Sequence, residues 1–167
     1  QSGFTVPSAV EEKLDDYLLT LLRKDVVPDF YSEGMASTVR AAALSALAGK
    51  GKIDLSDLKR YRPRLKEMAL FGKAQFLLSA IGVEDAEDIR KEAFSLIVAH
   101  ADQSGGKFVL SEVIDDGYSR ILSSPLRTHG AVLSALIAYG RTAEGAALVG
   151  DIPSRLVRHI AQTRKTN

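Results

Sequence analysis

The chain alternates between segments that are apolar on nearly every side and segments with a single apolar stripe. Ser124–Gly140 is of the first kind, with a Ser-Pro pair suited to the start of a helix and a glycine suited to its end. Met35–Ala48 is another such segment, broken mainly by Arg40. A helix that is apolar all round must be covered on several sides. The pattern therefore predicts two inner helices, Met35–Ala48 and Leu126–Tyr139, as the most buried elements, with the rest of the chain arranged around Ser124–Gly140.

The remaining helical segments carry apolar residues at every third or fourth position, which marks one buried face. A short helix is expected after Asp54, a preferred cap, through Lys59 or Tyr61, with Asp57 as a weak capping-box partner. The other expected helices are Pro7–Lys24, Pro63–Ile81, Asp85–Asp102 and Ile152–Arg164.

A Gly-Gly pair at residues 105–106 interrupts the helical pattern. Beyond it, Phe108, Leu110 and Val113 lie between polar neighbours, which predicts at most one short strand or hairpin near residues 107–114. Residues 114–123 are expected to form a loop or a short helical turn. The whole pattern predicts one all-α domain over residues 1–167, with about seven or eight helices paired as inner and outer layers.

The amino-acid composition argues against several classes of function. Basic residues (22) and acidic residues (21) nearly cancel, and no basic stripe with interleaved aromatic residues appears, so no nucleic-acid partner is expected. Cysteine is absent, which excludes disulfides, cysteine metal sites and a thiol nucleophile within this chain. The longest apolar run is far shorter than the roughly 18 residues of a membrane span.

The histidines give no metal-binding pattern. His100, His129 and His159 lie on three separate predicted helices, and none has a second ligand at metal spacing. We expect packing, capping or solvent-facing roles for all three, because histidine is commonly half-buried.

Two neighbouring carboxylates, Asp115 and Asp116, are the candidates for acid–base chemistry. Paired carboxylates can cleave a glycosidic bond, but aspartates in a loop more often cap a helix, and capping is the expected role.

Ser123-Ser124 lacks the Gly-x-Ser-x-Gly elbow of a hydrolase nucleophile. Gly105-Gly106-Lys107 lacks the rest of a phosphate-binding loop and precedes a strand rather than a helix.

Arg40 and Arg127 are charges on otherwise apolar helices. Each either reaches a carboxylate or extends outward to water along its aliphatic stem. A structural ion pair is favoured, with Asp115 or Asp116 as the candidate partner.

The order of several segments resembles the thioester domain of bacterial alpha-2-macroglobulins. The segments that carry the resemblance cover most of the chain from Val6 onward: VRAAALSALAGKGKIDLSDLKRY, LLSAIG before an acidic helix start, DDGYSRILSSPLRTHGAVLSALIAYG and DIPSRLVRHIAQTR. The resemblance implies an α/α toroid, a ring of helical hairpins with inner and outer helices. It also implies a parent protein that traps proteases. A protease cuts a bait region, the molecule rearranges, and an internal Cys–Gln thioester reacts with amines of the attacker.

In that family the thioester lies in a Cys-x-Glu-Gln motif upstream of the matching segments, and this chain has neither the motif nor a cysteine. The chain is therefore expected either to be a fragment of such a domain or to come from a member that lacks the thioester. The fragment is favoured, as an incomplete toroid that is not itself an enzyme. No catalytic, cofactor-binding or metal-binding residue is assigned. The resemblance implies a periplasmic parent protein, often lipid-anchored to a membrane, whose partners are proteases and the neighbouring domains of the same chain.

Two other readings stay open: a helical-repeat module that binds a protein on its concave face, and an α/α-toroid carbohydrate-active enzyme using Asp115 or Asp116. An incomplete ring would also leave apolar surface on its terminal helices, which predicts self-association through them. The residues expected to be uncovered are Leu18, Leu21, Leu22, Leu156 and Ile160.

Overall fold

The computed structural model describes residues 5–24 and 27–163. It confirms the all-α fold, because 69% of the described residues are helical and their one sheet has only two short strands. The α-helices of the described residues are α1 (Ser8–Lys24), α2 (Glu33–Ala48), α3 (Leu55–Tyr61), α4 (Leu70–Ile81), α5 (Glu87–Val98), α6 (Pro125–Tyr139), α7 (Gly145–Val149) and α8 (Ile152–Thr163). The 3-10 turns are η1 (Arg62–Arg64), η2 (Ser104–Gly106) and η3 (Asp116–Ile121), and the strands are β1 (Ala101–Asp102) and β2 (Val109–Leu110).

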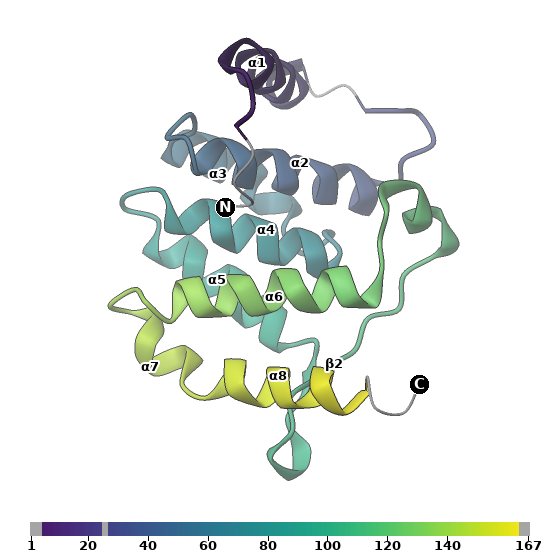
Figure 1. Cartoon of the computed structure of the whole chain (residues 1–167), viewed down its shortest axis with the longest axis vertical. Helices are drawn as coiled ribbons and strands as arrows, with labels where there is room; N and C mark the ends of the chain where they lie inside the picture. Colours follow the sequence, from purple (N-terminus) through teal and green to yellow (C-terminus); the bar gives the residue numbers. More distant parts are fainter. Residues whose placement is uncertain (1–4, 25–26, 164–167) are drawn as a thin grey trace.

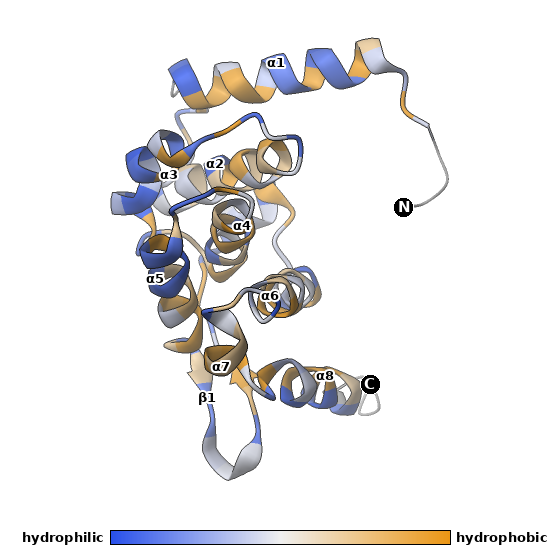
Figure 2. Ribbon diagram, turned by 90° about the vertical axis from the view of Figure 1, so that its left-hand side faces the viewer, coloured by the Kyte–Doolittle hydropathy of each residue, from blue (hydrophilic) through white to orange (hydrophobic). Residues whose placement is uncertain are grey.

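The helices form two layers. Helices α2, α4 and α6 lie side by side, with their N-terminal ends at the same edge of the molecule (Figure 1). Helices α3 and α5 lie behind this layer, while α1 crosses above α2 and α8 lies beside α6 at the opposite end (Figure 2). None of the helices in the described ranges is long and apolar enough to cross a membrane.

The centre of the fold is α4 rather than the predicted Ser124–Gly140 helix. Helix α4 packs between α2 and α6 with α5 behind it, and most of its residues are buried. In α6 the Leu126 side chain is 68% exposed and Ile137 is 41% exposed, so the prediction that this helix is among the most buried was wrong. Apolar residues all round a helix indicated burial, but α6 has packed neighbours on only part of its circumference. Helix α2 is largely buried, as predicted.

The predicted helix Pro63–Ile81 is in fact two pieces, η1 and α4, separated by residues 65–69. Two side chains from distant parts of the chain satisfy the amides at this break. Ala69 N donates to Thr38 Oγ1 at 2.9 Å, and Leu70 N donates to Glu112 Oε1 at 2.5 Å. These partners supply the hydrogen bonds that a continuous helix would otherwise provide.

The predicted helix Asp85–Asp102 is shorter at both ends. Asp85 has a φ of 55°, which a helix does not accommodate, and α5 begins two residues later. At the other end α5 stops at Val98, and Ala101 pairs with Leu110 across an antiparallel hairpin. The short strand expected near residues 107–114 is thus β2, and its partner β1 comes from the segment predicted to be helical.

Helix α1 is anchored from its middle to its C-terminal end. Its buried Asp15 accepts hydrogen bonds from Lys50 Nζ at 2.9 Å and Lys52 Nζ at 2.7 Å, and Tyr61 Oη donates to Leu22 O at 2.6 Å. The N-terminal half of α1 extends beyond α2 (Figure 2). An exposed apolar stripe runs from this half past the middle of α1, with exposed fractions of 54% at Val10, 52% at Leu14 and 63% at Tyr17.

The exposed residues of the terminal helices differ from those predicted. Leu22 and Leu156 are buried, and Leu18, Leu21 and Ile160 are half-buried against the core. The apolar stripe of α1 was identified correctly, but the half that packs is the C-terminal one. Arg164, the predicted end of the last helix, lies outside the described residues.

Candidate interaction surface

A groove opens where the first turns of α4 and α6 meet the middle of α2 and the end of η3. Its volume is about 280 Å³, and it continues to a pair of aromatic residues in the loop before α2. We name this surface the aromatic–arginine groove. Its lining residues are Tyr31, Thr38, Val39, Ala42, Phe71, Arg120, Ile121, Leu122 and Arg127, and Phe30 lies beside them.

Arg127 closes one wall of the groove. Ser124 caps α6 as predicted, because its hydroxyl accepts from Arg127 N at 3.2 Å. The Arg127 guanidinium lies 3.9 Å from the centroid of the Phe71 ring and donates to Ile121 O at 2.6 Å and Leu122 O at 3.0 Å. The predicted ion pair of Arg127 with Asp115 or Asp116 is therefore wrong. An aromatic face and two carbonyls hold this cation instead.

The rest of the groove and its rim combine aromatic rings, a second arginine and an exposed leucine. Phe30 and Tyr31 meet edge to face with centroids 5.2 Å apart, and the Arg120 guanidinium lies 5.1 Å from the Phe30 centroid. Leu122 has a φ of 57° and is 79% exposed. A leucine in the left-handed region is strained, and strain of this kind gathers at functional positions. Aromatic and arginine side chains are also the residues that most often anchor protein interfaces.

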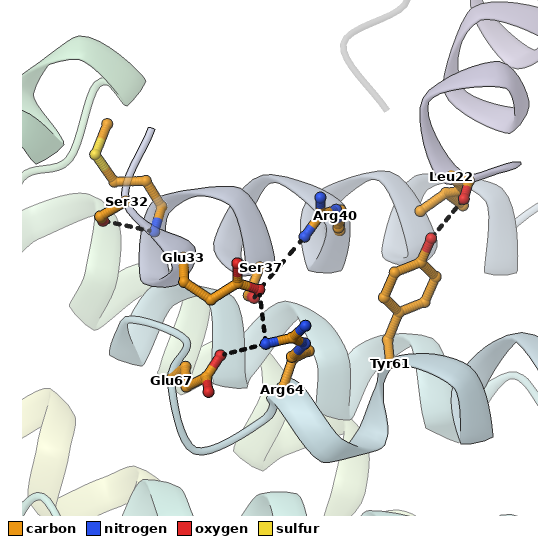
Figure 3. Close-up of polar contacts among 9 residues, drawn as sticks. Leu22, Ser32, Glu33, Ser37, Arg40, Tyr61, Arg64 and Glu67 are labelled. Carbon is orange, nitrogen blue, oxygen red and sulfur yellow. Dashed lines mark hydrogen bonds and ion pairs between the residues drawn. The ribbon is translucent and has the colours of Figure 1, made fainter. Parts of the chain in front are cut away.

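Arg40 belongs to a separate network between α2 and η1 (Figure 3). Its guanidinium lies 3.7 Å from the carboxylate of Glu33, which also pairs with Arg64 at 3.2 Å. Arg64 in turn lies 3.4 Å from Glu67. An ion pair was predicted correctly for Arg40, but its partner is Glu33 rather than Asp115 or Asp116. The network links the start of α2 to η1.

The structure gives a capping role to the first of the two loop aspartates. Asp115 Oδ1 accepts from Gly117 N at 2.7 Å and caps η3, as predicted. Asp54 likewise caps α3 in a capping box with Asp57. The glycines 105–106 form the tip of the β1–β2 hairpin. These local interactions account for the loop residues that the sequence singled out.

The structure brings two of the three histidines together, which the sequence did not predict. The rings of His129 on α6 and His159 on α8 meet edge to face with centroids 6.2 Å apart. Burial lowers the pKa of His129, and the nearby His159 lowers it further. His100 lies apart, with Nδ1 3.3 Å from Ser111 O. Across the described residues, no three His, Asp or Glu side chains are grouped so that they could hold a metal ion.

Sequence reasoning also missed a buried lysine. Lys73 is 3% exposed, and its ammonium group donates to Met68 O beside Glu112. Burial lowers the pKa of Lys73, while the Glu112 carboxylate acts in the opposite direction. Both side chains line a cavity of about 310 Å³, but both also satisfy backbone groups at the start of α4. The visible signal was a single cation in the apolar stretch LFGKAQFLLSAI, and it indicates a structural role here.

Comparisons of the chain with protein-family models, curated proteins and solved structures find no match.

Proposed function

We propose that this chain is a non-catalytic helical scaffold of a macroglobulin-like protease trap, and that its aromatic–arginine groove binds a neighbouring domain of the same parent protein. The observation that carries the proposal is the layer of α2, α4 and α6, with their N-terminal ends at one edge and α3 and α5 behind them (Figures 1 and 2). Repeated pairs of helices, each with one inner and one outer helix, build superhelices and rings. This repeat supports the resemblance to an α/α toroid.

The groove supports a binding role rather than a catalytic one. An aromatic ring and two backbone carbonyls hold the Arg127 guanidinium in one orientation. A planar guanidinium held in this way can donate hydrogen bonds to a partner surface. Its exposed apolar members, Phe30 and Leu122, would be desolvated by a partner surface. A neighbouring domain of the parent protein fits this surface because its attachment to the same chain raises its effective concentration at the groove.

The proposal is tested by titrating this chain with the flanking domains encoded in the complete open reading frame. Arg127→Ala removes the guanidinium from Phe71 and should weaken binding about tenfold, as for an interface anchor. Lys59→Ala, at an exposed position of α3 behind the layer, should leave binding unchanged. Circular dichroism verifies that both variants are folded. Equal binding by wild type and Arg127→Ala would exclude the groove as the docking surface.

The open reading frame itself separates the proposal from its alternatives. A macroglobulin-like parent encodes Cys-x-Glu-Gln upstream and β-rich domains on the flanks. A helical-repeat module would instead be flanked by further helical hairpins. Flanks without β-rich domains would contradict the proposed parent.

A further inference from the structure

A second recess lies between the tip of the β1–β2 hairpin and α8, away from the aromatic–arginine groove. Its volume is about 190 Å³. One wall is the hairpin tip with its two glycines and Lys107, and the other is a face of α8 that carries Arg155, Arg158, His159 and Gln162. The side chains that line it are therefore three permanent cations, one imidazole and one amide, and no carboxylate is among them.

The three cations of this recess differ in whether another group of the chain pairs with their charge. Arg155 Nε lies 3.2 Å from Asp151 Oδ1, Arg155 Nη2 donates to Gln103 Oε1 at 3.2 Å, and its guanidinium lies 5.9 Å from the Phe108 centroid. These contacts fix Arg155 in place. Lys107 and Arg158 make no ion pair within 4.0 Å among the described residues.

The hairpin also carries a carboxylate, Asp102, but this side chain binds the backbone of the turn. Asp102 Oδ1 accepts from Ser104 N at 2.8 Å, and this hydrogen bonding lowers the pKa of Asp102, with a smaller contribution from Lys107. The Asp102 carboxylate thus closes the turn and is not part of the recess lining. Among the described residues, Arg158 pairs with no carboxylate, and Lys107 has only the longer-range attraction of Asp102, so both charges can bind a ligand.

The hairpin tip has a backbone conformation that favours glycine. Gly105 has a φ of 59° and Gly106 a φ of 71°, consecutive left-handed conformations that favour glycine. A Cβ at either position would meet no atom within 4 Å. Backbone conformation rather than crowding therefore requires glycine here, and the wall beside Lys107 carries no side chain.

We propose that this recess binds a tetrahedral oxyanion, a phosphate or sulfate group. Guanidinium groups match the oxygens of such anions with paired, directed hydrogen bonds, and an ammonium group adds a point charge. Arg155 supplies a fixed guanidinium, while Arg158 and Lys107 supply positive charge from opposite walls. The inference is independent of the proposed function, because it uses no residue of the aromatic–arginine groove.

The test is titration of the whole chain with inorganic phosphate and, separately, inorganic sulfate, at an ionic strength held constant with chloride. Two-dimensional amide NMR should show saturable shifts at residues 105–107 and along α8. Arg158→Ala and Lys107→Ala should each raise the dissociation constant about tenfold, the effect of losing one charged hydrogen bond. The tighter of the two anions identifies the group that the recess is built for.

Arg141→Ala is the matched control, because Arg141 is an exposed cation after α6 that does not line the recess. It should leave the dissociation constant unchanged. Unchanged circular dichroism spectra verify the fold of each variant. Shifts that fail to saturate, shifts that chloride alone reproduces, or equal losses in Arg158→Ala and Arg141→Ala would each overturn the proposal.

Discussion

Gly72 on α4 packs directly against Thr38 on α2, so closely that a Cβ added at Gly72 would lie 2.9 Å from the Thr38 Cα. The Thr38 hydroxyl also accepts from Ala69 N, which places the start of α4 on the face of α2. The two backbones thus meet at the centre of the fold, and this contact positions one wall of the aromatic–arginine groove.

Gly72→Ala should destabilise the chain by about 1–3 kcal/mol, because the added methyl group forces two helix backbones apart. Gly130→Ala is the matched control, since Gly130 lies within α6 and a Cβ there meets no atom within 4 Å. It should stabilise by about 0.5–1 kcal/mol through helix propensity. Urea denaturation followed by circular dichroism measures both. A Gly72→Ala variant as stable as wild type would refute the close contact.

The attachment of α1 should depend on pH through Asp15. Hydrogen bonds from Lys52 and Lys50 hold the pKa of Asp15 below its ordinary value of 3.8. Because the pKa is lower in the folded chain, the carboxylate stabilises the fold above pH 3.8, and this stabilisation is lost as the pH falls below that value. Asp15→Asn should therefore lower stability at pH 7 and have a much smaller effect at pH 3.

Urea denaturation at both pH values measures the Asp15 effect. Asp16→Asn changes the exposed neighbouring carboxylate and should alter stability little at either pH. If Asp15→Asn were equally destabilising at pH 7 and pH 3, the two lysines would not account for the effect.

The His129–His159 contact should make the packing of α8 on α6 sensitive to mild acid. The pKa of His129 lies below its ordinary value of 6.5, mainly because of burial and also because of His159. Neutral His129 is thus favoured by folding, so its contribution is fully present above pH 6.5 and is lost as the pH falls through the lowered pKa. His129→Gln should reduce the loss of stability between pH 7.5 and pH 5, whereas His100→Gln should preserve it. NMR titration of the imidazole signals gives a direct check, and a His129 pKa at or above 6.5 would contradict this account.

The exposed stripe of α1 should drive self-association of the chain. Val10, Leu14 and Tyr17 present one continuous apolar face beyond the edge of α2, and a second copy of the chain can cover it. Light scattering should show a mass that rises with concentration, and Leu14→Glu should restore a monomer. Leu148→Glu, a change of an exposed leucine on α7, is the control and should still associate. A monomer with a radius of gyration of about 15 Å at every concentration would refute this association.

Interactions between residues close in sequence were predictable, and those between distant residues were not. The caps at Asp54, Asp115 and Ser124 follow a spacing of two or three residues, so the sequence alone identified them. The break before α4 depends on Thr38 and Glu112, which lie 31 and 42 residues away from the amides that they accept from. No local pattern indicates such partners.

The candidate surfaces also depend on contacts between residues that are distant in the sequence. Arg127 was recognised as a charge on an apolar helix, but its partner Phe71 comes from another helix and could not be identified from spacing. The pairing of His129 with His159 likewise depends on how α8 packs on α6. The centrality of α4 was missed because the pattern placed its apolar stretch in the longer helix Pro63–Ile81 with one buried face, whereas α4 is a separate helix that packs against α2, α5 and α6.

The most direct test of the proposed function is a trapping assay with the full-length parent protein. The parent is mixed with an active protease, and the products are separated under denaturing conditions. The account predicts that cleavage of the parent is followed by a protease adduct that survives denaturation, and that prior treatment with a small primary amine prevents the adduct by consuming the thioester. A parent that is cleaved without retaining any protease, with or without the amine, would contradict the account.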